Sequence, residues 1–353
     1  MKALVWHGRK DVRVEEVPDP RPPAPGQVQI DVAWCGVCGT DLHEYLGGPL
    51  YIPVDAPHPL TGAQAPVILG HELSGQIVAI GDGVEGFAMG DRIAACPIIG
   101  CLECRWCKSG FMGQCENVAF LGISWEGGGF AERMNLNAYQ AYKLPPSVSS
   151  DVGALVEPWA ASVRMVARAG IGPDDNVAVV GAGPIGLMAL VAARIAGAKR
   201  VVSLEVAGRR IELARQCGAT AVVNPVEEDP FQRGQEHTDG EGFDVVLECV
   251  GRPDTGLLAG RLARIRGRIM VMGVFEKPAP LDFTDLVYGE KTVMGSMGGY
   301  GMFDEAIALL ADERFPGDTL ITGRIRLDDI IDQGFRPVIE EKERHVKILV
   351  SPN

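Results

Sequence analysis

The sequence predicts a two-domain α/β protein, in which a β-rich domain comes before a domain built on a parallel sheet. The chain has 353 residues, about twice the ~150 residues of an ordinary domain. Residues 1–150 are rich in glycine and proline with short Val/Ile runs between them, which is typical of short strands joined by turns. Beyond about residue 150, apolar runs alternate with helix-length segments, which indicates a doubly wound parallel sheet.

The β-rich domain is expected to contain both ends of the chain. Near the C-terminal end, a predicted helix at 303–311 leads into a final apolar strand at 346–350. We therefore expect residues 1–150 and 291–353 to form one domain, with residues 151–290 inserted as the other. Two early strands of the first domain are predicted from their apolar runs, at 28–32 and 76–80.

The inserted domain shows the alternation of strands and helices most clearly. A segment at 184–196 is nearly all small or apolar, as a helix packed on a sheet would be. A second segment, 209–217, places its apolar residues between charges and is followed by Gly218, a helix stop signal. Four apolar runs are predicted as parallel strands, at 177–180, 201–204, 245–247 and 269–272.

Composition and charge argue against several classes of protein. Hydrophobic residues make up 46% and charged residues 22%, which is ordinary for a folded soluble chain. The 33 basic and 46 acidic residues leave a net charge of −13, which disfavours a nucleic-acid or anionic-membrane partner. The start of the chain reaches charges before any signal-peptide core, and the longest apolar run, 177–193, is shorter than the ~20 residues of a membrane helix. We expect a cytoplasmic protein whose nine cysteines stay reduced.

A glycine motif directly after the first strand of the inserted domain predicts a dinucleotide site. The strand at 177–180 is followed by Gly-x-Gly-x-x-Gly and then at once by a helix. The first glycine permits a tight turn, the second lets the backbone approach a pyrophosphate, and the third brings helix and strand together. The alternative is a purely structural turn. The residues predicted to contact the cofactor are Gly181, Gly183, Pro184, Ile185 and Gly186.

An acidic residue after the next strand favours NAD over NADP. Glu205 lies nineteen residues beyond Gly186, where a carboxylate can accept both hydroxyls of the adenine ribose. A 2′-phosphate at that position would be repelled by the carboxylate. The neighbouring Arg209 and Arg210 would soften this repulsion, and Arg210 is taken as a further cofactor contact.

Four cysteines predict a structural metal lobe at about 96–116. They follow the spacing Cys-x2-Cys-x2-Cys-x7-Cys, which lets one loop arrange four thiolates tetrahedrally around a metal. An iron–sulfur site of the bacterial type would need three residues between the third and fourth cysteines and then proline, whereas here there are seven and then Glu116. Reactive thiols are the other alternative. We predict structural zinc bound by Cys101, Cys104, Cys107 and Cys115.

A second set of ligand-type residues is spread along the sequence, which is typical of an open catalytic metal site. Cys35, Cys38 and His43 stand close together near the start, and His71 and Glu72 follow later. Catalytic zinc sites use three protein ligands and keep one position for water or substrate. For His71 the alternative is a buried, hydrogen-bonded histidine.

These motifs, in this order, resemble the zinc-containing medium-chain alcohol and polyol dehydrogenases over essentially the whole chain. The matching residues are Cys-Gly-Thr-Asp-Leu-His at 38–43, Gly-His-Glu at 70–72 with Gly75 and Gly81, the four-cysteine lobe and the glycine motif. Within the family the chain is most similar to the 2,3-butanediol dehydrogenase group, through 38–45, 58–62 and 153–158. The resemblance implies a GroES-like catalytic domain formed by both ends of the chain, with a Rossmann NAD-binding domain inserted.

The resemblance also implies which residues would hold a catalytic zinc. Cys38, rather than Cys35, matches the thiolate ligand of the family. His71 would be the second ligand and Glu157 the third. Glu72 would either exchange onto the zinc or support it from behind, and which of the two glutamates binds directly stays open.

The expected chemistry is acidification and oxidation of an alcohol. A thiolate, a neutral imidazole and a carboxylate cancel the charge of a dication, so a bound alcohol would lose its proton near neutral pH. The resemblance implies that this proton leaves through the Thr40 hydroxyl, the nicotinamide ribose and then His43. Asp41 would hydrogen-bond the far nitrogen of His71 and fix its tautomer. Thr40 and Asp41 could also be ordinary turn residues.

The function predicted from the sequence is reversible, NAD-linked oxidation of a secondary alcohol by a zinc enzyme. A vicinal diol such as 2,3-butanediol, oxidised to acetoin, is the first substrate candidate, before sorbitol-type polyols and L-threonine. The alternative from another class is a catalytically silent NAD- and zinc-binding protein, against which the retained ligand and relay residues argue. A zinc-free quinone reductase would have no use for the four-cysteine lobe. One catalytic and one structural zinc per subunit are expected, in a homodimer or homotetramer.

Overall fold

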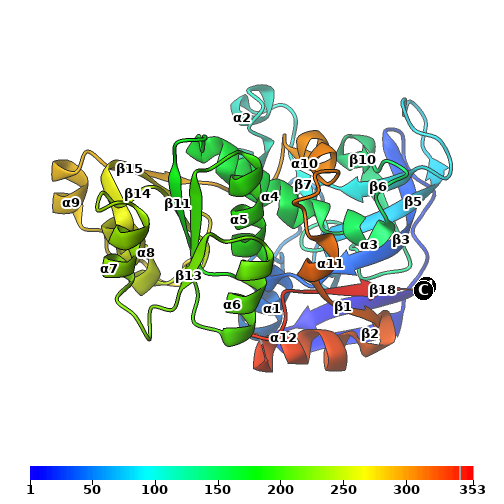
Figure 1. Ribbon diagram of the computed structural model, residues 1–353. Helices are drawn as coiled ribbons and strands as arrows, with labels where there is room; N and C mark the ends of the chain where they lie inside the picture. The colour runs from blue at the N-terminus through cyan, green and yellow to red at the C-terminus, as the bar shows by residue number, and fades with distance from the viewer. Residues whose placement is uncertain (342, 353) are drawn as a thin grey trace. The chain divides into compact units, whose positions relative to one another are not determined.

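A computed structural model describes residues 1–341 and 343–352, and the chain divides into two compact units (Figure 1). The first unit comprises Met1–Glu157, Phe303–Ala311 and Ile321–Asn353. The second unit comprises Pro158–Met302 and Asp312–Leu320. The C-terminal strand therefore belongs to the same unit as the N-terminal half of the chain.

The first unit is built around a seven-stranded sheet in the order β10-β6-β5-β3-β18-β17, with β9 paired to β3. Strand β3 is its centre, because it contacts β5, β9 and β18. The strands are β3 (Gln27–Gly36), β5 (Glu72–Ile80), β6 (Arg92–Ala95), β9 (Arg133–Asn137), β10 (Ala141–Lys143), β17 (Ile321–Arg326) and β18 (Lys347–Ser351).

Burial explains why this sheet forms. In β3, Val28, Ile30 and Val32 are fully buried on alternate positions, so one face of the strand lies in the core. A smaller sheet, β2-β1-β4, and the pair β7-β8 complete the strands of the unit. Their bounds are β1 (Lys2–Gly8), β2 (Asp11–Glu16), β4 (Val67–Ile68), β7 (Ile98–Ile99) and β8 (Ala119–Phe120).

The helices of the first unit are short. They are α1 (Gly39–Gly47), α2 (Arg105–Lys108), α3 (Ser150–Gly153), α10 (Phe303–Leu309) and α12 (Arg336–Glu340). Short 3₁₀ turns occur at Met112–Gln114, Ala138–Gln140 and Leu327–Asp329, and a π-helical turn at Ile330–Phe335. Helix α4 (Val156–Ala169) begins with the last residues of the first segment of this unit and continues into the second unit.

The second unit contains a six-stranded, all-parallel sheet in the order β13-β12-β11-β14-β15-β16. The strand order reverses between β11 and β14, and ligands of such sheets bind at this switch point, beyond the carboxyl ends of the strands. The strands are β11 (Asn176–Val180), β12 (Arg200–Leu204), β13 (Ala221–Val223), β14 (Phe243–Glu248), β15 (Ala263–Val271) and β16 (Thr292–Gly295).

Helices cover both faces of this sheet, α5 and α6 on one and α7 and α8 on the other (Figure 1). Every residue of β11 is buried, as a continuous apolar run in a central parallel strand should be. Helix α5 is buried from Gly186 to Ala193, which explains its almost wholly apolar sequence. The helices are α5 (Pro184–Ile195), α6 (Gly208–Gln216), α7 (Pro230–His237), α8 (Pro253–Leu262), α9 (Phe283–Tyr288) and α11 (Gly317–Leu320).

The described residues include no helix that combines the length and the apolar character needed to cross a bilayer.

Candidate active site

Cys38 lies where the central strand of the first unit turns into a helix. Strand β3 ends at Gly36, and Cys38 precedes the first turn of α1. The backbone N–H of Cys38 donates to Asp41 Oδ2 at 2.9 Å, so the Asp41 carboxylate folds back over the start of the helix. This turn leaves Cys38 Sγ 3.8 Å from Thr40 Oγ1. The local sequence therefore places a thiol and a hydroxyl side by side.

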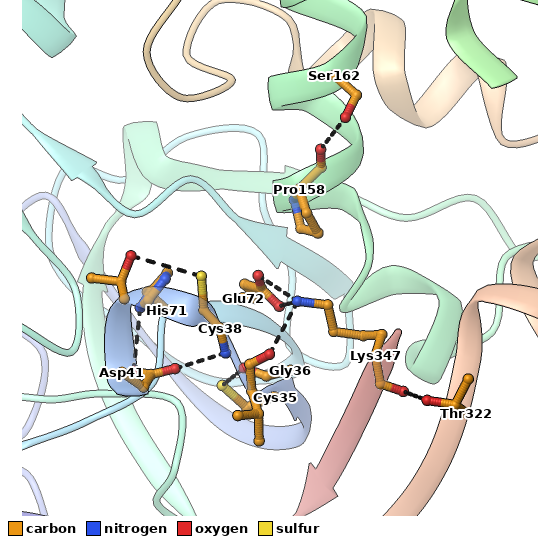
Figure 2. A network of polar contacts seen from close by, with 12 residues as sticks. Cys35, Gly36, Cys38, Asp41, His71, Glu72, Pro158, Ser162, Thr322 and Lys347 are labelled. Carbon is orange, nitrogen blue, oxygen red and sulfur yellow. Dashed lines mark hydrogen bonds and ion pairs between the residues drawn. The ribbon is translucent and has the colours of Figure 1, made fainter. Parts of the chain in front are cut away.

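His71 reaches the same place from the start of β5. Gly70 has a φ of +98°, and a Cβ there would lie 2.7 Å from the backbone N of Phe130, so only glycine fits before the histidine. His71 Nδ1 lies 3.6 Å from Asp41 Oδ1, and neither atom has a hydrogen-bond partner among the described residues. The structure thus brings Asp41 to the histidine, at ion-pair distance rather than hydrogen-bond distance (Figure 2).

Three ligand-type side chains converge at this point. One potential ligand atom from each of Cys38, His71 and Glu72 lies within 4.8 Å of the other two. Among the described residues, Glu157 lies outside this group. The charge of Glu157 nevertheless acts on His71, so its carboxylate lies nearby. Thiolate, imidazole and carboxylate are the donors that zinc prefers, and the set fits that ion.

The electrostatics of the cluster favour an added positive charge. Burial lowers the pKa of His71, but the negative charges of Cys38 and Asp41 outweigh it and raise the pKa well above its usual value. Desolvation of the Glu157 carboxyl group, followed by the charge of Glu72, raises the pKa of Glu157 to about 7. Acidic groups thus crowd a site from which water is largely removed. A divalent cation would relieve that crowding.

Cys35 and His43, the other candidates near Cys38, have different environments. Cys35 is fully buried, and burial raises the pKa of its thiol well above the usual value. Its Sγ would lie 2.6 Å from a Cβ at Gly129, so the thiol fills a packed space in the core. His43 is exposed on α1, one helical turn after Thr40.

The four predicted lobe cysteines also come together. Their sulfur atoms all lie within 4.8 Å of one another. Backbone N–H groups point at two of the sulfurs: Cys104 N donates to Cys101 Sγ at 3.2 Å, and Cys101 N donates to Cys115 Sγ at 3.3 Å. Such contacts stabilise thiolates, so the loop is prepared for a tetrahedral zinc ion. Gly100 is needed here, because a Cβ would lie 2.8 Å from Cys107 Sγ.

In the second unit, the glycine motif forms the tight turn between β11 and α5. Gly181 has a φ of +91°, and a Cβ at Gly186 would lie 1.8 Å from the carbonyl oxygen of Gly181. Helix α5 begins at Pro184, so its free N–H groups lie at the carboxyl end of the sheet. A Cβ at Gly183 would lie 3.8 Å from an Arg210 nitrogen, so the guanidinium flanks the turn. These features fit a bound pyrophosphate.

Glu205 has a structural role that the sequence did not indicate. It is 7% exposed, and its Oε2 accepts from the N–H of Ala182 at 2.7 Å. Its Oε1 accepts from the N–H groups of Val206 and Ala207, at 2.7 and 3.0 Å. The carboxylate therefore ties the glycine turn to the loop after β12. Oε1 uses both of its lone pairs in this way, so Oε2 retains the one that can accept a ribose hydroxyl.

Two further residues lie near these sites that the sequence motifs did not identify. Glu248 is fully buried at the end of β14, and its Oε1 accepts from the N–H groups of Val250 and Gly251 at 3.1 and 2.9 Å. An acidic residue at the carboxyl end of the strand beside β11 is the sequence feature that could have identified Glu248. Lys347 opens the apolar strand β18 and forms an ion pair with Glu72. A lysine at the start of an otherwise apolar final strand is the feature that could have identified Lys347.

Two family models match the chain, one in each half. The model described as "Alcohol dehydrogenase GroES-like domain" matches residues 24–146. The model described as "Zinc-binding dehydrogenase" matches residues 184–312. The first match contains Cys38, His71 and the four-cysteine lobe, and the second begins inside the glycine motif.

Individual relatives agree with these matches. The (R,R)-butanediol dehydrogenase of Bacillus subtilis (strain 168) is 40% identical over 353 residues, which covers 100% of both chains. The sorbitol dehydrogenase of the same strain is 31% identical over 356 residues, covering 100% of this chain and 98% of the relative. The crystal structure of 2R,3R-butanediol dehydrogenase from Bacillus subtilis is similar with a TM-score of 0.94 and 40% identity, covering 100% of this chain and 99% of that one.

A unit with a buried cluster of metal-ligand side chains and a unit with a dinucleotide-binding turn define an NAD-dependent dehydrogenase that uses a metal ion. The chain belongs to the zinc-containing medium-chain alcohol dehydrogenases. The resemblance drawn from the sequence is confirmed, and so is the predicted fold, a Rossmann domain together with a GroES-like domain. The catalytically silent alternative is correspondingly disfavoured.

Proposed function

We propose that the protein catalyses the reversible, NAD-linked oxidation of a vicinal diol such as 2,3-butanediol to the hydroxyketone acetoin. The observation that supports this most is the cluster of Cys38, His71 and a carboxylate in a chain that also has the dinucleotide turn. Relatives named butanediol dehydrogenases, at 40% and 32% identity over their whole length, favour the diol. A relative named sorbitol dehydrogenase, at 31%, makes longer polyols the second candidate.

Each predicted site residue of the first unit would have a defined role in the reaction. Zinc, when bound, polarises the oxygen of the alcohol or ketone, and NAD⁺ accepts the hydride that leaves the alcohol carbon. Cys38 and His71 would hold the ion together with a glutamate, and Asp41 would fix the orientation of His71. Thr40 Oγ1, adjacent to Cys38 Sγ, would take the hydroxyl proton, and the exposed His43 would release it to solvent. The products are a ketone, NADH and one proton.

The environment of Glu205 supports NAD rather than NADP. The carboxylate accepts three backbone N–H groups, which fixes its negative charge beside the glycine turn. A 2′-phosphate on the adenine ribose would lie against this fixed charge and be repelled. A ribose hydroxyl of NAD can instead donate to the remaining lone pair of Glu205 Oε2.

A panel of alcohols tests the proposed activity. Purified protein would be mixed with NAD⁺ and, separately, with each stereoisomer of 2,3-butanediol, with sorbitol and with L-threonine, while the absorbance of NADH is followed. We expect the highest kcat/KM with one butanediol stereoisomer and loss of the signal after treatment with a chelator. Replacing NAD⁺ by NADP⁺ should lower kcat/KM at least about tenfold, because of the charge of Glu205. If no alcohol of the panel gives NADH, the proposal is refuted.

We further propose that the protein is a homodimer formed through the edge of the second unit's sheet. Among the described strands, β16 pairs with β15 alone, so its other edge has backbone groups without a strand partner. Val293 on this strand is 37% exposed. Helix α9, which directly precedes it in the chain, exposes Phe283, Val287 and Tyr288 by 71%, 72% and 84%. Apolar side chains beside an unpaired strand suit the same strand of a second copy.

A charged substitution tests this edge. Val293→Lys places a charge where two copies of β16 would meet, so we expect the dimer dissociation constant to rise at least about tenfold, measured by light scattering over a dilution series. Met89→Lys, at a 62% exposed apolar position of the first unit, is the matched control and should leave the mass unchanged. Equal behaviour of the two variants would contradict the proposed interface.

The nine cysteines, none in a disulfide, suit the cytoplasm as the location.

A further inference from the structure

Lys347 and Glu72 form a buried ion pair across the central strand of the first unit. In the sheet, β5 and β18 lie on either side of β3. Gly36 pairs with Glu72 on one side and with Leu349 on the other, and Lys347, two residues before Leu349, lies on the same face as Gly36. Side chains from strands that are ~9.6 Å apart thus meet over one glycine.

Gly36 makes this crossing possible because it has no side chain. A Cβ at Gly36 would lie 2.3 Å from Glu72 Oε2 and 3.1 Å from Lys347 Cδ. The Lys347 ammonium group has all its donors engaged: Nζ lies 2.7 and 2.5 Å from the two Glu72 carboxylate oxygens and 3.1 Å from the carbonyl oxygen of Val37 (Figure 2). Glu72 is 1% and Lys347 2% exposed. Water is therefore excluded, and the two charges depend on each other.

The ion pair lies directly beside the metal-ligand cluster. A Glu72 oxygen is within 4.8 Å of both Cys38 Sγ and a His71 ring nitrogen, so a modest shift would bring the carboxylate into the coordination shell of a bound ion. Both Glu72 oxygens, however, are held by Lys347. Proximity alone would make Glu72 a ligand, whereas its hydrogen bonds direct it to the lysine.

We propose that Lys347 is a positioning residue that holds Glu72 outside the coordination shell of the catalytic metal and so keeps one coordination position open for the alcohol. The inference rests on the proposed function, since it requires a catalytic metal at Cys38 and His71. Without the lysine, the buried carboxylate would turn to the positive charge of the bound metal ion instead. Glu157 is then left as the carboxylate that binds the ion.

The experiment uses full-length protein with cobalt(II) exchanged into the catalytic site and zinc kept at the four cysteines. The visible d–d absorption of cobalt reports the number and kind of ligands without any need for turnover. The primary variant is the double substitution Lys347→Met with Glu72→Gln, which replaces the ion pair by a neutral pair of similar size. We expect its cobalt spectrum and its rate of metal release to a chelator to equal those of the wild type. A changed spectrum, with release faster by about tenfold or more, would make Glu72 a ligand and overturn the inference.

The single substitution Lys347→Met tests whether Glu72 binds the metal once the lysine is removed. It frees Glu72, so we expect weaker d–d bands, as an added ligand produces, and release of the metal slowed by about tenfold. Lys347→Arg should restore the wild-type spectrum. Lys143→Met, which breaks the exposed ion pair between Lys143 and Asp91, is the matched control and should change neither readout. If Lys347→Met folds and has the wild-type spectrum, the inference is wrong; if it does not fold, the double variant decides.

The metal content of the wild type separates this inference from the proposed function. Two metal ions per chain are expected. A single ion, held by the four cysteines, would refute the catalytic metal site itself. Two ions together with a shifted spectrum in the double variant would refute only the role given to Lys347.

Discussion

Substitution of Cys38 by serine is expected to reduce kcat/KM for the diol by at least about 10³-fold, equivalent to ~4 kcal/mol of transition-state stabilisation. The physical reason is that a serine hydroxyl stays protonated and is a poor zinc ligand, so the ion is lost from the cluster with His71. The measurement is the initial rate of NADH formation, with the metal content determined on the same sample. One ion per chain should remain, at the four cysteines.

Cys35→Ser is the matched control, because the two cysteines are three positions apart in the same segment. The Cys35 thiol is buried in the core and has a raised pKa, so it should stay a neutral thiol. We expect Cys35→Ser to keep both metal ions and most of the activity, with a loss of stability of about 1–2 kcal/mol from the buried hydroxyl. Equal loss of activity in the two variants would reverse the assignment of the ligand.

The second large effect is expected at the dinucleotide turn. In Gly186→Ala, the added Cβ would lie 1.8 Å from the carbonyl oxygen of Gly181, so the turn between β11 and α5 must open. Overpacking of this kind costs about 1–3 kcal/mol, and the displaced backbone N–H groups no longer match a pyrophosphate. We expect the KM for NAD to rise about 10- to 100-fold, with both metal ions retained.

Gly260→Ala provides the comparison within the same unit. Gly260 lies in helix α8, and a Cβ there meets no atom within 4 Å. The change should leave the KM for NAD unchanged and stabilise the helix by up to about 1 kcal/mol. An unchanged KM in Gly186→Ala as well would show that the glycine turn does not bind the cofactor.

Local patterns made much of the fold predictable. The continuous apolar run around Val179 and the glycine turn after it specify a buried parallel strand followed by a helix, without reference to the rest of the chain. Strand β16 was missed because its residues are mostly exposed, so an edge strand shows neither the apolar run of a central strand nor a clear alternation. Strand β13, with three residues, is too short for any periodicity.

The site was predictable where spacing fixes geometry and unpredictable where distant segments meet. The four lobe cysteines lie within fifteen residues, and their spacing alone predicts the cluster that the structure contains. Lys347 lies 275 residues from Glu72, and only the pairing of β3 with β5 and β18 brings the two together. The backbone hydrogen bonds of Glu205 were likewise hidden, because a carboxylate at a strand end does not reveal which N–H groups the next loop will turn toward it.

Diffraction at the zinc absorption edge, on crystals of catalytically active protein, tests most directly that a divalent cation is held by Cys38, His71 and one glutamate. We predict two anomalous peaks per chain, one within bonding distance of Cys38 Sγ and a His71 ring nitrogen and the other surrounded by the four lobe cysteines. A single peak at the four cysteines, in crystals whose dissolved protein still oxidises the diol, would contradict this assignment of the catalytic metal site.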